Sequence, residues 1–64
     1  MNAQESHGFY ESGMIHLQNK NYIEAIGDFT NAISNKPNHK EAYYQRGIAK
    51  EHINFNSRTI AGRI

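Results

Sequence analysis

The residues of this chain that could perform acid–base or metal chemistry are few and widely spaced. The inventory consists of four histidines and six carboxylates, and cysteine is absent, so no thiol nucleophile and no disulfide can form. The histidines show neither the i, i+4 pairing nor the short-range pairing typical of zinc ligands. They are His7, His16, His39 and His52. We therefore predict no metal site and no cofactor.

Nucleophilic catalysis finds equally little support. The sequence contains no Gly-rich phosphate loop and no Gly-x-Ser-x-Gly motif. Ser12 precedes Gly13, but both fall in the middle of an expected helix, on its packing face. Glu24 and Asp28 lie one helical turn apart and could share a site, yet such a pair without a pocket is more typical of a solvated helix face. We predict that the chain is not an enzyme and has no catalytic residues.

Length and charge narrow the remaining classes of protein. At 64 residues the chain is one small domain, residues 1–64, and a domain of this size is marginally stable without good helix packing or a partner. The formal net charge is +1, and the basic residues are scattered, which argues against a nucleic-acid partner. No apolar run approaches the roughly 20 residues of a membrane span. The polar N-terminal residues are unlike a secretory signal. We expect a cytoplasmic protein without a membrane partner.

Three matching signals predict where helices begin. Asn2, Asn21 and Asn38 are each followed three residues later by a glutamate. An asparagine at the N-cap accepts a hydrogen bond from a free backbone N–H, and the glutamate can reach back toward the cap. A helix is therefore expected to follow each asparagine.

The expected helices run from about residue 3 to 17 or 18, from 22 to 35, and from 39 or 40 onward. A short polar turn, residues 19–21, separates the first two, and Pro37 ends the second. Two continuations are open for residues 54–64. They form a turn and a short fourth helix, or they prolong the third helix, which we prefer because no proline interrupts them.

The first and third expected helices share a pattern in which an aromatic residue stands four positions before a glycine. The two copies lie 34 residues apart. They read Phe9-x-x-Ser12-Gly13-x-x-His16 and Tyr43-x-x-Arg46-Gly47-x-x-Lys50. Between them stand Tyr22, Ala25-x-x-x-Phe29, Ala32 and Pro37. A fixed period of this length is the sequence signature of a helical repeat.

The combination of these residues resembles the tetratricopeptide repeat family. The resemblance covers about residues 6–53 and implies about one and a half repeats, the first over about 6–39 and a partial second over about 40–64. In the first repeat two positions depart from the family, since Ser12 stands where leucine is usual and His16 where tyrosine is usual. In the second repeat Arg46 and Lys50 stand at the same two positions. The signature residues are Phe9, Gly13, Tyr22, Ala25, Phe29, Ala32, Pro37, Tyr43 and Gly47. The implied fold is all-α, an antiparallel helix–turn–helix plus a third helix, as in a fragment of a right-handed α-solenoid.

Spacing and resemblance together predict the core. Gly13 and Ala25 should allow the first two helices to approach closely, and Phe9, Phe29 and Ile33 should fill the space around that contact. The third helix should pack through Tyr43 and Gly47. The full predicted core is Phe9, Gly13, Tyr22, Ala25, Ile26, Phe29, Ala32, Ile33, Tyr43 and Gly47.

The resemblance also implies a function, because in the family the concave faces of the first helix of each repeat bind peptides. The matching positions here are His7, Tyr10, Met14, Leu17 and Gln18 in the first helix and Glu41, Tyr44, Ile48, Glu51 and His52 in the third. Tyr10, Met14 and Leu17 recur at helical spacing as an apolar stripe that we expect to be separate from the core stripe. An aromatic and aliphatic stripe of this kind is typical of a contact surface. We expect a protein-interaction module.

Two occupants of that surface are open, a peptide from another protein or a second copy of this chain. We favour self-association, with a dimer first, because repeats bury their apolar faces on neighbours and usually need three or more copies for stability. Exchange of a long third helix between chains, a domain swap, is one route to such a dimer. The basic clamp with which some family members hold a C-terminal carboxylate is absent, since Tyr10, Met14, Glu41 and Gln45 occupy its positions.

The second hypothesis is a small helix-turn-helix nucleic-acid-binding protein, because two helices joined by a three-residue turn also describe that motif. Asn31, Asn35 and Lys36 are residue types that can reach base edges. Glu24 and Asp28 on the same helix would repel phosphate, so we rank this class below protein binding.

Overall fold

The chain folds into three α-helices. The computed structural model describes the backbone of residues 3–62 and the side chains of residues 5–55. Helix α1 spans Ala3–Gln18, α2 spans Tyr22–Asn35 and α3 spans Lys40–Gly62, and no strand occurs between residues 3 and 62. The predicted all-α fold is confirmed.

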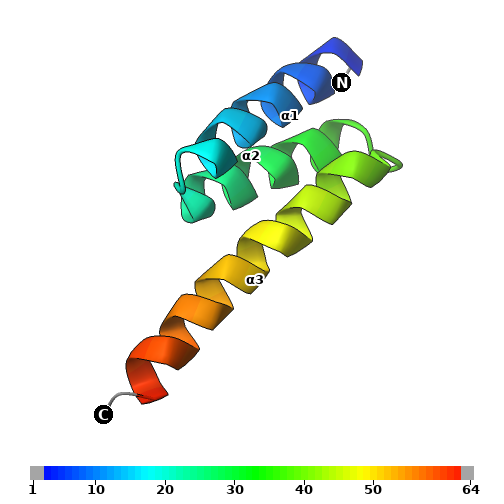
Figure 1. The fold of residues 1–64 in the computed structure, drawn as a ribbon. Helices are drawn as coiled ribbons and strands as arrows, with labels where there is room; N and C mark the ends of the chain where they lie inside the picture. The colour runs from blue at the N-terminus through cyan, green and yellow to red at the C-terminus, as the bar shows by residue number, and fades with distance from the viewer. Residues whose placement is uncertain (1–2, 63–64) are drawn as a thin grey trace.

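Helix α2 packs against both of its neighbours, whereas α1 and α3 barely touch. Figure 1 shows α1 and α2 side by side with opposite chain directions, and α3 running back along α2 and then past the end of the pair. The molecule is therefore elongated, with extents of 47 × 20 × 13 Å. The far half of α3 projects beyond the compact part of the fold.

The helix boundaries follow the sequence signals closely. Helices α1 and α2 have the expected bounds, and α3 continues unbroken to Gly62. The longer third helix is the continuation that we preferred. Its length has a local cause, because neither glycine nor proline occurs between Gly47 and Gly62.

Helix α1 ends in a Schellman-type turn. The backbone N–H of Asn21 donates to the carbonyl of His16 at 2.8 Å, and that of Lys20 donates to Leu17 at 3.0 Å. Lys20 adopts a left-handed conformation, with φ of 64°, which is the position that glycine usually takes in this turn.

The predicted asparagine caps are confirmed in position at Asn21 only, and the predicted capping hydrogen bond is absent there. Asn21 occupies the N-cap of α2, but its side chain makes no capping hydrogen bond. Helix α3 begins at Lys40, and His39 rather than Asn38 caps it, because the His39 Nδ1 accepts from the Ala42 N–H at 3.3 Å. The predicted cap at Asn2 lies outside the described residues.

Small side chains dominate the core and allow close helix packing. Apart from Phe29, the fully buried hydrophobic residues are alanines. The set is Ala25, Phe29, Ala32, Ala42 and Ala49. A buried hydroxyl adds a polar link between helices, since Ser6 Oγ donates to the Ala32 carbonyl at 2.8 Å. Such a bond satisfies a hydroxyl whose burial would otherwise be unfavourable.

Two residues of the predicted core are exposed. Tyr43 is 46% exposed, and no other helix or side chain beyond its chain neighbours lies within 4 Å of where a side chain at Gly47 would begin. Helix α3 contributes Ala42 and Ala49 to the core instead. The prediction failed because Tyr43 and Gly47 occupy a different side of α3 from the one that meets α2.

Candidate interaction surface

The predicted apolar stripe of α1 is largely used inside the fold. Tyr10, Met14 and Leu17 are partly buried and pack against the core. The Tyr10 ring lies 5.9 Å from the Phe29 ring and is stacked on His39 with centroids 4.9 Å apart. We had expected this stripe to be separate from the core, and that expectation is wrong. The connection into α3 covers part of it.

The remaining predicted positions on α1 form a polar border. His7 and Gln18 are both exposed. His7 Nε2 pairs with the carboxylate of Glu11 one turn along the helix. Exposed pairs of this kind contribute little to stability.

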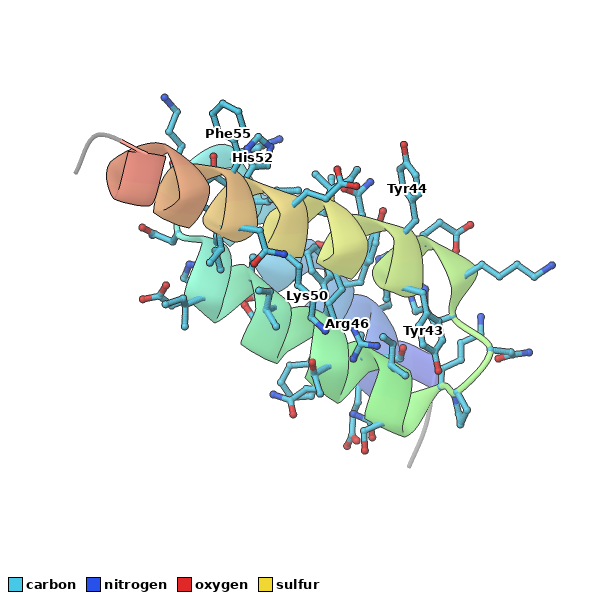
Figure 2. The ribbon with its side chains drawn as sticks, turned by 90° about the horizontal axis from the view of Figure 1, so that it is seen from below. Tyr43, Tyr44, Arg46, Lys50, His52 and Phe55 are labelled. Atoms are coloured by element: carbon cyan, nitrogen blue, oxygen red, sulfur yellow. The ribbon has the colours of Figure 1, made fainter. Side chains whose placement is uncertain are left out.

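Helix α3 carries the most exposed of the predicted hydrophobic residues. Tyr44 is 68% exposed, Glu41 is exposed and Ile48 is half-buried. Figure 2 shows Tyr44, His52 and Phe55 on one side of α3, away from Tyr43, Arg46 and Lys50. We call the row formed by Tyr44, Ile48 and Phe55 the aromatic row of α3.

Phe55 extends this row and was missed by the sequence reasoning. It is 66% exposed and follows Tyr44 by about three helical turns, so both side chains lie on the same side of α3 (Figure 2). The spacing could have revealed it. The open choice of structure after residue 53 prevented us from extending the helix to this position.

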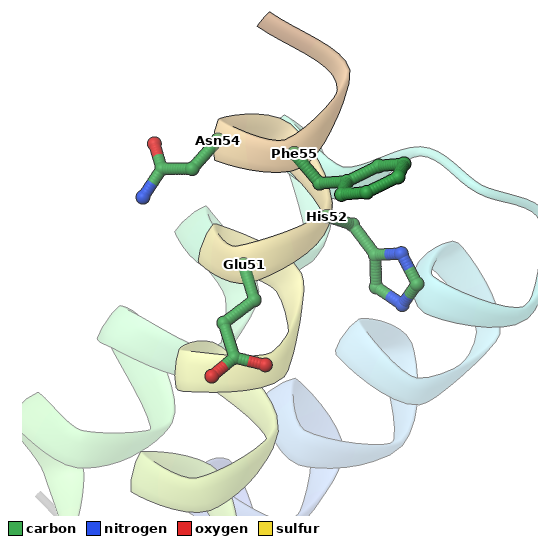
Figure 3. Close-up of a pocket in the computed structure, with 4 residues that line it drawn as sticks. All are labelled: Glu51, His52, Asn54 and Phe55. Carbon is green, nitrogen blue, oxygen red and sulfur yellow. The ribbon is translucent and has the colours of Figure 1, made fainter. Parts of the chain in front are cut away.

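An open hollow of about 520 Å³ adjoins the far end of the aromatic row. Figure 3 shows its four lining residues, Glu51, His52, Asn54 and Phe55. The His52 ring is stacked on Tyr22, with centroids 4.7 Å apart and planes 6° from parallel. This stack ties the middle of α3 to the start of α2 and thereby helps to fix the direction in which α3 projects.

A second polar cluster lies between α1 and α2. Ser12 Oγ donates to Asp28 Oδ2 at 2.8 Å, and His16 Nε2 lies 3.6 Å from the same oxygen. The Asp28 side chain is 20% exposed, so the solvated position that we expected for it is wrong. An open hollow of about 610 Å³ borders the cluster, lined by Glu5, Gly8, Phe9, Ser12 and Asp28.

The cluster joins the two helices through the side chain of Asp28. The Ser12 hydroxyl donates a hydrogen bond to the Asp28 carboxylate, and His16 contacts that carboxylate rather than the hydroxyl. The two departures from the family pattern, Ser12 and His16, thus hold Asp28 at the contact between the helices.

Among the described residues, no group of three histidine, cysteine or carboxylate side chains could hold a metal ion. Within the same part of the chain, no helix combines the length and the apolar character needed to cross a membrane.

Comparisons with models of protein families, with curated protein sequences and with solved structures find no match. The resemblance to tetratricopeptide repeats therefore rests on the sequence pattern of this chain alone.

Proposed function

We propose that this chain is a non-catalytic protein-interaction module of the tetratricopeptide type, and that it self-associates. Support for the repeat reading comes from the contact between α1 and α2. Gly13 and Phe29 meet there, and Ala25 and Ala32 are fully buried, as close packing of a helical pair requires. The 34-residue echo in α3 supplies the start of the next unit.

The aromatic row of α3 is the observation that carries the binding function. Tyr44 and Phe55 are each about two-thirds exposed, at 68% and 66%, on the same side of the helix (Figure 2). Large aromatic side chains bury about 150–250 Å² each when they are covered. Aromatic residues are enriched in interfaces relative to the rest of a protein surface.

Self-association follows from where the row lies. Phe55 lies toward the end of α3 that projects past the α1–α2 pair (Figure 1). Tyr44 lies nearer the start of α3 and is 68% exposed, so a second copy can reach the row at both ends. Two such helices can cover each other in an isologous contact, in which each row buries the other. A chain of this size has a small core and is only marginally stable on its own, so dimerisation would add to its stability.

Sedimentation velocity across a wide range of concentrations tests the proposal. We expect a monomer–dimer equilibrium in the unmodified chain and a shift toward monomer in Tyr44→Glu. Ile15→Glu is the matched control, because Ile15 is also a hydrophobic residue exposed on a helix, at 58%. A chain that is monomeric at every concentration would contradict self-association.

A further inference from the structure

We call each copy of the aromatic–glycine pattern a glycine unit. Among the described residues, no helix packs over the second glycine unit, which lies in α3. In α1, Phe9, Ser12, Gly13 and His16 face α2. In α3, the residues 34 positions later are Tyr43, Arg46, Gly47 and Lys50, which we call the basic face of α3. This face differs from the aromatic row, so the inference below goes beyond the proposed function.

The covered unit shows what such a set of residues holds. A Cβ on Gly13 would lie 2.6 Å from Cε1 of Phe29, so the aromatic ring occupies the space that the glycine leaves. The preceding residue of α2, Asp28, places its carboxylate 2.8 Å from Ser12 Oγ and 3.6 Å from His16 Nε2. An adjacent acidic and aromatic pair on one helix thus fits one glycine unit.

The basic face of α3 is uncovered among the described residues, whereas the matching face of α1 around Gly13 is covered by α2. No atom apart from the backbone of its own helix and its two chain neighbours lies within 4 Å of a Cβ built on Gly47. Lys50 is exposed and Tyr43 is 46% exposed. Figure 2 shows Tyr43, Arg46 and Lys50 in a row along the same side of α3. A helix seated here would lie beside α2 as well, since Arg46 borders α2 at Thr30.

The charge of this face specifies the chemistry of a helix that would pack on it. Arg46 and Lys50 replace the neutral hydroxyl and the imidazole that hold Asp28 in the first unit. The Arg46 guanidinium donates to Thr30 Oγ1 at 3.3 Å and lies 5.3 Å from the centre of the Tyr43 ring, and a guanidinium carries five N–H donors in all. Hydrogen bonds from such cations to a carboxylate are stronger than neutral ones.

We propose that the basic face of α3 binds an amphipathic helix of a partner protein that carries an acidic residue followed directly by an aromatic residue. The aromatic ring covers Gly47, and the carboxylate lies between Arg46 and Lys50. A second copy of this chain does not present such a pair, because its own Phe29 is fully buried and its Asp28 is bonded to Ser12.

The chain itself provides the probe sequence. A synthetic peptide with the sequence of residues 21–36 contains the Asp–Phe pair. It is cross-linked between positions 24 and 31, both exposed in α2, because a free peptide of this length is marginally helical in water. Binding of the fluorescently labelled peptide to the full chain is measured by anisotropy.

Three variants separate the contacts. Gly47→Ala should raise the urea midpoint of the chain, since alanine favours the helix. The same variant should weaken peptide binding by at least about tenfold, because the alanine methyl group enters the space for the aromatic ring of the peptide. The double variant Arg46→Glu, Lys50→Glu should lose binding of the unmodified peptide. A peptide with Asp28→Lys should bind this double variant and not the unmodified chain.

Rescue by the reversed charge, together with weaker binding to a more stable Gly47→Ala chain, supports the proposal. The proposal is overturned if the peptide does not bind the unmodified chain. It is also overturned if the peptide binds the unmodified chain, Gly47→Ala and the double variant equally, because the peptide would then be replacing α2 inside the fold. The chain could instead form a dimer through this face. If the double variant is monomeric and the peptide does not compete with dimerisation of the unmodified chain, the proposal of a separate partner helix is wrong.

Discussion

The ring of Phe29 in α2 occupies the space that a side chain at Gly13 in α1 would need. Three carbon atoms of the ring lie 2.6–2.9 Å from the position of a Cβ on Gly13, closer than the van der Waals contact of carbon atoms allows. Phe29 is fully buried. This contact therefore sets the distance between α1 and α2 and determines that only glycine fits at position 13.

Gly13→Ala should destabilise the chain. Overpacking of a core costs about 1–3 kcal/mol, which outweighs the gain of about 0.5–1 kcal/mol that alanine brings within a helix. Gly27→Ala is the matched control, because nothing lies within 4 Å of its Cβ position and it should stabilise by that same gain. Urea unfolding followed by circular dichroism measures both. Equal shifts in the two variants would refute the close contact.

Lys20→Gly should stabilise the chain. Lys20 holds a φ of 64°, and the left-handed region costs a residue with a side chain about 1–2 kcal/mol, part of which glycine loses again through its greater freedom in the unfolded chain. A net gain of about 0.5–1 kcal/mol is expected in urea unfolding. Lys36→Gly is the control, since Lys36 has an extended conformation with φ of −140° and should gain nothing.

The bond between Ser12 and Asp28 should appear as a coupling energy. Because the acceptor is a part-buried carboxylate, a double-mutant cycle of Ser12→Ala and Asp28→Ala should give about 1–2 kcal/mol. The same cycle with Glu24→Ala, on an exposed residue of the same helix, should be additive within about 0.5 kcal/mol. A coupling that is equally small in both cycles would show that the Ser12–Asp28 bond adds nothing.

The parts of the fold that depend on neighbours in the sequence could be predicted. Pro37 cannot lie in the interior of a helix without breaking a backbone hydrogen bond, so it stops α2 from continuing. The spacing of Ala25, Phe29 and Ala32 marks one face of α2 whatever packs on it. The bounds of α1 and α2 and the buried face of α2 followed from these local rules.

The parts that depend on which helix meets which could not be predicted in the same way. The repeat pattern placed Tyr43 and Gly47 in a contact, but it did not show that no helix would cover them among the described residues. The stripe that contains Tyr10 appeared independent of the core because nothing local showed that His39 would stack on it. Asp28 appeared solvated because Ser12 and His16 belong to another helix.

The oligomeric state of the chain with and without its aromatic row tests the central claim most directly. Sedimentation velocity over a dilution series is compared for the unmodified chain, Tyr44→Glu and Ile15→Glu. Because Tyr44 is 68% exposed, its replacement should change the free energy of unfolding of the monomer by no more than about 0.5 kcal/mol, which circular dichroism checks. We predict dimers for the unmodified chain and for Ile15→Glu, and monomers for Tyr44→Glu. The same sedimentation behaviour for all three chains would contradict the account.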